Sequence, residues 1–161
     1  MLLSYRCASA SVPKEADDYL FELLQSAHAK RLWDHRQWHV LMHYRPRLFG
    51  AGVESQVDDP SFFLSPSGKF DPRAELEATL AGFFAPAVPA EGTEHPQCEY
   101  IARYHWLKQE LGFDSRGLEE HACPRFDDWL AEMNPEGVTL VFPVAYLNNP
   151  ASMFGHTLLR V

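Results

Sequence analysis

The residue best placed to carry out chemistry in this chain is His156, which stands where a polar turn passes into an apolar segment. Residues 148–152 have the composition of a turn, and residues 157–161 that of a strand. A strand would fix the direction of the imidazole, so His156 could act as a general base. A strand-edge histidine with a structural hydrogen bond fits the same pattern, and both roles stay open. The residues expected to support this site are Asn148, Asn149, Ser152 and Gly155.

Two cysteines, Cys98 and Cys123, each stand near the start of a predicted helix. In an exported protein a disulfide bond between them is the natural interpretation. It would close a loop of about 26 residues and stabilise the fold by about 3 kcal/mol through the lost entropy of the unfolded chain. A nucleophilic Cys123 is an alternative, because the start of a helix lowers the pKa of a thiol. His95 and His121 lie near these cysteines in the sequence, but the spacing is not that of a zinc site. No metal is therefore expected.

Three histidines, His35, His39 and His43, are spaced four residues apart, so a continuous helix would present them on one face. Two imidazoles at this spacing can chelate a metal ion. Arg36, however, replaces the glutamate of the His-Glu-x-x-His zinc motif, and no downstream carboxylate motif follows. A histidine face that is solvated or packed against aromatic rings is the favoured interpretation.

The charge of the chain speaks against binding to nucleic acid, because the formal net charge is −8. No basic run or cationic amphipathic helix offers a surface for anionic lipid. Arg45 and Arg47, at the predicted end of a helix, could bind a carboxylate or a lipid phosphate. Surface ion pairs are the simpler explanation for these two arginines.

The length and composition fit a folded domain, with 161 residues of which 46% are hydrophobic. No stretch approaches the roughly 18 apolar residues that cross a membrane. The N-terminal residues 1–16 carry Ala8-Ser9-Ala10, a small-x-small pattern typical of signal-peptide cleavage, but Tyr5-Arg6-Cys7 interrupts the apolar run. We interpret this segment as a signal-peptide remnant or a disordered terminus.

The hydrophobic pattern predicts a mainly helical region followed by strands, and hence an α+β fold. Residues 49–70 are expected to form an ordered loop with residues 62–64 in the core, and residues 85–95 a linker. The predicted helices lie near residues 17–27, 38–44, 72–84, 101–111 and 124–133, and the predicted strands at 138–142 and 157–161. The predicted domains are a terminal segment 1–16, a helical domain 17–135, and the start of a second domain at 136–161.

Local signals fix some of these elements more closely. Asp71 is expected to cap the helix that begins at Pro72, and Gly112 to close the helix before it. The strand at 138–142 is continuously apolar, a pattern typical of a strand covered on both faces. In the last helix the residues expected to be buried are Phe126, Trp129, Leu130 and Met133.

Residues 146–160, Tyr-Leu-Asn-Asn-Pro-Ala-Ser-Met-Phe-Gly-His-Thr-Leu-Leu-Arg, resemble the opening motif of the Lnb N-terminal periplasmic domain family. Segments upstream resemble the helical region that commonly precedes that domain, so the resemblance covers the chain from about Asp17 onward. The fifteen-residue motif is the more specific part. The upstream segments that carry the resemblance lie at residues 41–44, 62–69, 95–98, 102–107 and 123–124.

The resemblance implies that residues 136–161 form the first strands of an incomplete, circularly permuted papain-like domain of the NlpC/P60 type. In that order the histidine comes first and the nucleophilic cysteine later. His156 matches the family's histidine, whereas the cysteine has no counterpart in these 161 residues. Cys98 and Cys123 lie upstream and do not match it. The chain is therefore expected to be an N-terminal fragment that is inert alone, with its last strand open and prone to aggregation.

The resemblance also implies a periplasmic or envelope-associated bacterial location, since some members of the family are lipoprotein N-acyltransferases. A phospholipid or a lipoprotein would be the substrate, a membrane surface a partner, and no cofactor is required. The expected activity of the whole protein is acyl transfer through a cysteine thiolate activated by histidine. The alternative is a non-enzymatic binding or scaffolding module of the envelope, stabilised by a disulfide bond.

Overall fold

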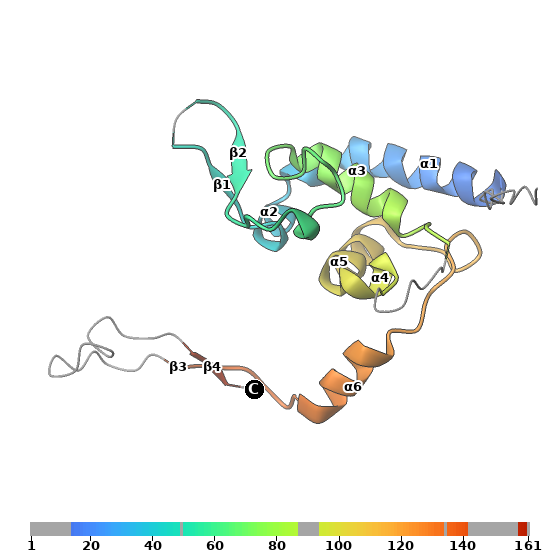
Figure 1. Ribbon diagram of the computed structural model, residues 1–161. Helices are drawn as coiled ribbons and strands as arrows, with labels where there is room; N and C mark the ends of the chain where they lie inside the picture. Colours follow the sequence, from blue (N-terminus) through green and yellow to red (C-terminus); the bar gives the residue numbers. More distant parts are fainter. Residues whose placement is uncertain (1–13, 49, 87–93, 134, 142–157, 161) are drawn as a thin grey trace, which may run out of the picture. The chain divides into compact units, whose positions relative to one another are not determined.

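The computed structural model describes residues 14–48, 50–86, 94–133, 135–141 and 158–160 (Figure 1). The chain divides into two compact units, Met1–Ala122 and Cys123–Val161, which are described separately. None of the helices in these described ranges is long and apolar enough to cross a membrane.

The first unit is mainly helical, with one small hairpin. Its elements are α1 (Lys14–Lys30), the short 3-10 helix η1 (Leu32–Asp34), α2 (Arg36–Leu41), β1 (Tyr44–Pro46), β2 (Val53–Ser55), the 3-10 helix η2 (Pro60–Phe62), α3 (Pro72–Gly82), α4 (Pro96–Glu99) and α5 (Ile101–Leu111). Helix α1 packs against α3 and α5, and α2 also packs against α5.

The core of this unit is built around a pair of indole rings. Trp38 on α2 is fully buried, and it stacks on Trp106 of α5 with ring centroids 5.7 Å apart. The indole N–H of Trp38 donates to the carbonyl of Pro72 at 3.0 Å, so its one polar atom is satisfied inside the core. Leu76 and Leu80 of α3 and Leu107 of α5 are also fully buried. The apolar faces of three helices therefore meet at one cluster.

The predicted helix boundaries at Asp71 and Gly112 are confirmed. The Asp71 carboxylate accepts hydrogen bonds from the backbone N–H groups of Arg73 and Ala74, both at 3.0 Å, and Pro72 occupies the first turn. Gly112 adopts a left-handed φ of 67° directly after α5. Each of these helix ends is set by residues that are neighbours in the sequence, which is why the sequence alone identifies them.

The predicted helix over 38–44 is too long. Helix α2 ends at Leu41, His43 has a left-handed φ of 55°, and Tyr44 begins strand β1. Strands β1 and β2 pair in antiparallel fashion, with Tyr44 opposite Ser55. The buried Ser55 hydroxyl donates to the Met42 carbonyl at 2.7 Å, so the chain after α2 is held by the second strand.

The segment predicted as an ordered loop over 49–70 therefore contains strand β2 and helix η2. As expected, Phe62 and Phe63 pack against the core as partly buried side chains. Their rings meet edge to face, with centroids 5.1 Å apart.

The second unit contains α6 (Pro124–Met133), β3 (Thr139–Val141) and β4 (Leu158–Arg160). The two strands pair in antiparallel fashion, with Val141 opposite Leu158. The helix and both strands confirm the predicted elements. The α+β fold class is confirmed as well.

The expected burial in this second unit is wrong. Trp129 is 51% exposed and Leu130 39%, and no residue of α6 is buried. Val138, expected to be the first residue of a strand covered on both faces, lies directly before β3 and is 70% exposed. The described part of this unit holds one helix and two three-residue strands, which are too few to cover those faces. The domain limits at residues 16 and 135 stay a prediction.

Candidate functional site

The predicted catalytic residue His156 lies outside the described residues. So do the supporting residues Asn148, Asn149, Ser152 and Gly155. What the structure shows is the strand that follows them, because β4 begins at Leu158 and pairs with Val141 of β3. A strand is thus formed two positions after His156, as the sequence predicts, and the role of the histidine stays a prediction.

Cys98 and Cys123 are joined in a disulfide bond, as expected. Cys98 lies in α4 and Cys123 directly before α6, and each is only 8% exposed. A sulfur held in a disulfide is neither a thiolate nucleophile nor a metal ligand. In the oxidised protein the bond therefore excludes the two alternative roles of Cys123.

His95 caps helix α4 through its ring. Its Nδ1 accepts the N–H of Gln97 at 3.2 Å, and its Nε2 hydrogen-bonds the carbonyl of Ala85 at 2.8 Å. Because Nδ1 accepts, Nε2 carries the proton and the imidazole is neutral. Burial and, to a lesser extent, the neighbouring His121 lower the pKa of His95, and the two rings lie 3.9 Å apart. Both ring nitrogens of His95 are used for structure.

The buried Gln97 side chain fastens the segment around these histidines. Its amide nitrogen donates to the carbonyls of Phe83 at 3.0 Å and Glu119 at 2.9 Å, and its oxygen accepts the N–H of His121 at 3.1 Å. Gln97 is only 1% exposed, so these bonds satisfy a polar group inside the protein.

The three spaced histidines do not share a helix face, which corrects that prediction. His35 is the N-cap of α2, His39 lies within it, and His43 lies beyond its end with a positive φ. Each ring contacts an aromatic residue: Trp106, Tyr44 and Phe62 respectively. The described residues contain no group of three histidine, cysteine or acidic side chains arranged to hold a metal ion.

The most buried charges of the first unit are an ion pair that the sequence analysis did not identify. Arg103 Nη1 donates to Glu75 Oε1 at 2.9 Å, with the two side chains 4% and 0% exposed. The Glu75 carboxylate also accepts the N–H groups of Leu64 at 3.0 Å and Ser65 at 2.8 Å. Arg103 Nη2 donates to the Phe62 carbonyl at 2.6 Å. The pair therefore holds the turn at residues 62–65 against α3 and α5.

Burial dominates the electrostatics of this network. Desolvation raises the pKa of Glu75 above its usual value, opposed by its hydrogen bonds and by Arg103. Desolvation likewise lowers the pKa of Arg103, opposed by Glu75. The hydroxyl of Tyr44, whose pKa burial raises, donates to the carbonyl of Gly68. All these groups are engaged within the protein, so we assign the network to structure.

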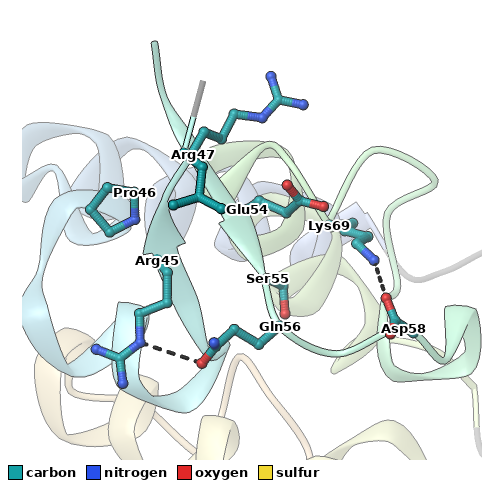
Figure 2. Close-up of a pocket in the computed structure, with 9 residues that line it drawn as sticks. Arg45, Pro46, Arg47, Glu54, Ser55, Gln56, Asp58 and Lys69 are labelled. Atoms are coloured by element: carbon teal, nitrogen blue, oxygen red, sulfur yellow. Dashed lines mark hydrogen bonds and ion pairs between the residues drawn. The ribbon is translucent and has the colours of Figure 1, made fainter. Parts of the chain in front are cut away.

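An open cavity of about 720 Å³ lies along the outer face of the β1–β2 hairpin (Figure 2). Arg45 Nε donates weakly to Gln56 Oε1 at 3.4 Å, and the Arg47 guanidinium lies 4.8 Å from the centre of the Phe70 ring. Within the described residues, neither arginine has a carboxylate at ion-pair distance. The expected surface ion pairs are thus not found. The other charged residues that line the cavity are Glu54, Asp58 and Lys69.

Comparison with known protein families gives matches in two parts of the chain. Residues 30–110, half of the chain, match a family described as a domain of unknown function, DUF7843. Residues 125–161 match the Lnb N-terminal periplasmic domain. No curated protein and no solved structure was found to match the chain. The second match begins close to the start of the second compact unit, and it includes the motif that carries His156.

Proposed function

This chain belongs to the DUF7843 family and closes with a match to the Lnb N-terminal periplasmic domain, and we propose that it is the N-terminal part of a Cys/His acyltransferase. The second match makes it a periplasmic, envelope-associated bacterial protein. The observation that carries the proposal is the motif at residues 146–160, which resembles the opening of the Lnb domain and contains His156.

In the proposed reaction, His156 removes the proton from a cysteine thiol, and the thiolate attacks the ester carbonyl of a phospholipid. Backbone N–H groups stabilise the oxyanion of the tetrahedral intermediate. The intermediate collapses to a thioester as the imidazolium protonates the departing alcohol, which leaves as a lysophospholipid. The α-amine of a lipoprotein cysteine then attacks the thioester, forming an amide and restoring the thiol. The reaction needs no metal or redox cofactor.

The nucleophile in this proposal is neither Cys98 nor Cys123, because both sulfurs are held in the disulfide bond. It is a cysteine that this 161-residue chain lacks, on a further segment of the polypeptide that completes the second unit. The exposed side chains of Trp129, Leu130 and Val138 support this, because a further segment of the second unit would cover apolar surface that is open here. By itself, then, the 161-residue chain is inert.

The test uses the complete polypeptide read from the native gene, including any codons that follow Val161. It is incubated with phospholipid vesicles and a peptide that carries a diacylglyceryl cysteine, and N-acylation is followed by mass spectrometry. We expect His156→Ala to lower the rate by about a thousandfold or more, because thiolate and base act as a unit. His105→Ala, which changes an exposed histidine on α5, is the matched control and keeps full activity.

Full activity in the His156→Ala variant would refute the proposed base. A stop codon directly after Val161 in an inactive protein would remove the nucleophile, and with it the enzyme. The second result favours the alternative, a non-enzymatic envelope module. The observation in its favour is the buried Cys98–Cys123 bond, which stabilises the helical part without any catalytic role.

A further inference from the structure

The tip of the β1–β2 hairpin presents a leucine to solvent. Leu48 is 94% exposed, far more than any other large apolar side chain among the described residues. The turn that carries it is closed by a hydrogen bond from the N–H of Arg47 to the carbonyl of Gly52, at 3.2 Å. Gly50 and Gly52 both have positive φ, 92° and 97°, which lets the chain reverse sharply there. The leucine therefore stands at the end of a protruding turn.

Two arginines, Arg45 and Arg47, come just before Leu48 on the first arm of the hairpin. Strand alternation turns Tyr44 and Ser55 inward, where they are 5% and 1% exposed, and leaves Arg45 on the outside. Figure 2 shows the side chains of Arg45 and Arg47 extending in opposite directions. Their contacts are a side-chain amide and an aromatic ring, with no carboxylate of the described residues at ion-pair distance.

The local charge differs in sign from that of the whole chain, whose net charge is −8. Along the cavity, Lys69 and Asp58 neutralise each other at 2.5 Å. That leaves Arg45 and Arg47 against a single acid, Glu54, which lies opposite Arg45 in the strand register. Phe70, under the Arg47 guanidinium, is itself 48% exposed. An excess of positive charge thus adjoins exposed apolar surface.

We propose that the hairpin tip docks on a phospholipid membrane, with Arg45 and Arg47 on lipid phosphates and Leu48 in the acyl boundary. A membrane offers separate phosphates side by side, which suits two guanidinium groups that diverge, whereas one free phosphate would require them to converge. Combined charge and apolar contact is the general basis of interfacial binding. The envelope location of the protein puts such a surface within reach. The proposal does not depend on acyl transfer.

The experiment measures sedimentation of the full chain with vesicles of phosphatidylethanolamine and phosphatidylglycerol. We expect Arg45→Gln with Arg47→Gln to weaken binding by about 30-fold, taking the usual contribution of each arginine near an anionic surface. The matched control is Arg36→Gln with Arg116→Gln, which makes the same change of net charge at two exposed sites elsewhere and leaves binding unchanged. Circular dichroism confirms that each variant is folded.

Two further arms decide what the arginines bind. Leu48→Ser removes the apolar contact without changing charge, and it should also weaken binding to vesicles. Inorganic phosphate, tested by calorimetry, should show no binding that depends on Arg45 and Arg47. The proposal is overturned if the variant that lacks Arg45 and Arg47 binds vesicles as well as its control that lacks Arg36 and Arg116. It is also overturned if Leu48→Ser binds as well as the native chain, or if inorganic phosphate binds through Arg45 and Arg47. Acyl-transfer activity is not measured, so failure here leaves the proposed enzyme untouched.

Discussion

Glu75 and Arg103 form an ion pair from which solvent is excluded, with 2.9 Å between Oε1 and Nη1 and exposures of 0% and 4%. The carboxylate also accepts two backbone N–H groups, and the guanidinium donates to a backbone carbonyl. The guanidinium carbon lies 4.5 Å from the Phe62 ring centre and 4.3 Å from that of Tyr100. This pair joins α3, α5 and the turn between β2 and α3.

Removing one charge of this pair should destabilise the protein strongly. Glu75→Gln keeps the size of the side chain but leaves the Arg103 charge buried without its counter-ion. Loss of one partner of a buried pair costs about 3–5 kcal/mol. The shift of the urea unfolding midpoint measures this loss.

The control for Glu75→Gln is Glu120→Gln, which removes the partner of Lys108 from an exposed ion pair of 2.7 Å. An exposed pair contributes at most about 1 kcal/mol, so this variant should unfold almost as the native protein does. Equal midpoints for both variants would mean that water reaches Arg103.

Gly68 should not tolerate a side chain. A Cβ at this position would lie 2.2 Å from Glu75 Oε2 and 3.0 Å from the Phe63 ring. The carboxylate cannot move aside without losing its hydrogen bonds to Leu64, Ser65 or Arg103. We expect Gly68→Ala to cost about 1–3 kcal/mol, the usual range for overpacking.

Thermal unfolding of Gly68→Ala and Gly137→Ala measures this effect against a matched control. A Cβ on Gly137 would meet no atom within 4 Å. That variant should retain the native unfolding temperature or slightly exceed it. A native unfolding temperature in Gly68→Ala would show that the turn at residues 62–68 repacks freely.

The Cys98–Cys123 bond should contribute substantially to stability. Without the bond the unfolded chain regains conformational entropy that is equivalent to about 3 kcal/mol for a loop of this length, so Cys98→Ser with Cys123→Ser should unfold at lower urea concentration. Reduction of the native protein by dithiothreitol should have the same effect and leave the double variant unchanged. Alkylation by iodoacetamide without reductant, followed by mass spectrometry, should leave both cysteines unmodified. Modification of either one would contradict the bond.

His95 should make stability depend on pH. Burial, with a smaller effect of His121, lowers the pKa of His95 below its usual value near 6.5. Between the usual and the lowered pKa the unfolded chain therefore binds more protons than the folded one, and stability rises with pH. As pH falls from about 6.5, we expect the free energy of unfolding to decrease until the folded-state pKa is passed.

The variant His95→Asn isolates this effect, since an asparagine oxygen can still accept the N–H of Gln97 but does not titrate. Unfolding by urea at a series of pH values should show a shallower loss of stability on acidification in the variant. Parallel curves for the two proteins would assign the pH dependence to other groups.

The sequence predicts the ends of an element correctly where neighbouring residues set them. Asp71 and Gly112 mark helix ends because a cap and a left-handed turn involve neighbouring positions. The β1–β2 hairpin could not be predicted from the sequence, because strands of three residues carry no measurable periodicity. Tyr44 leaves the helix to pair with Ser55 and to reach the carbonyl of Gly68, and these partners are remote in the chain.

The buried ion pair was missed for a related reason. A helix places Glu75 on the same face as Leu76 and Thr79, so the pattern does contain a charge on a buried side. Its partner Arg103 lies 28 positions further on, and nothing local connects the two. For α6 the prediction was wrong in the opposite direction, because side chains expected to be buried are exposed. An amphipathic pattern indicates which side of a helix is apolar but not what covers it. The role of His156 stays a prediction from resemblance.

The disulfide bond has a consequence for the order of events during export. A chain that crosses a membrane with its N-terminus first delivers Cys7, then Cys98, and only later Cys123 to the oxidising side. Where Cys7 pairs with Cys98 before Cys123 arrives, the Cys98–Cys123 bond forms by exchange through a mixed disulfide, a step that a thiol–disulfide isomerase accelerates. Maturation of this protein would in that case depend on the envelope's capacity to reshuffle disulfides as well as to form them.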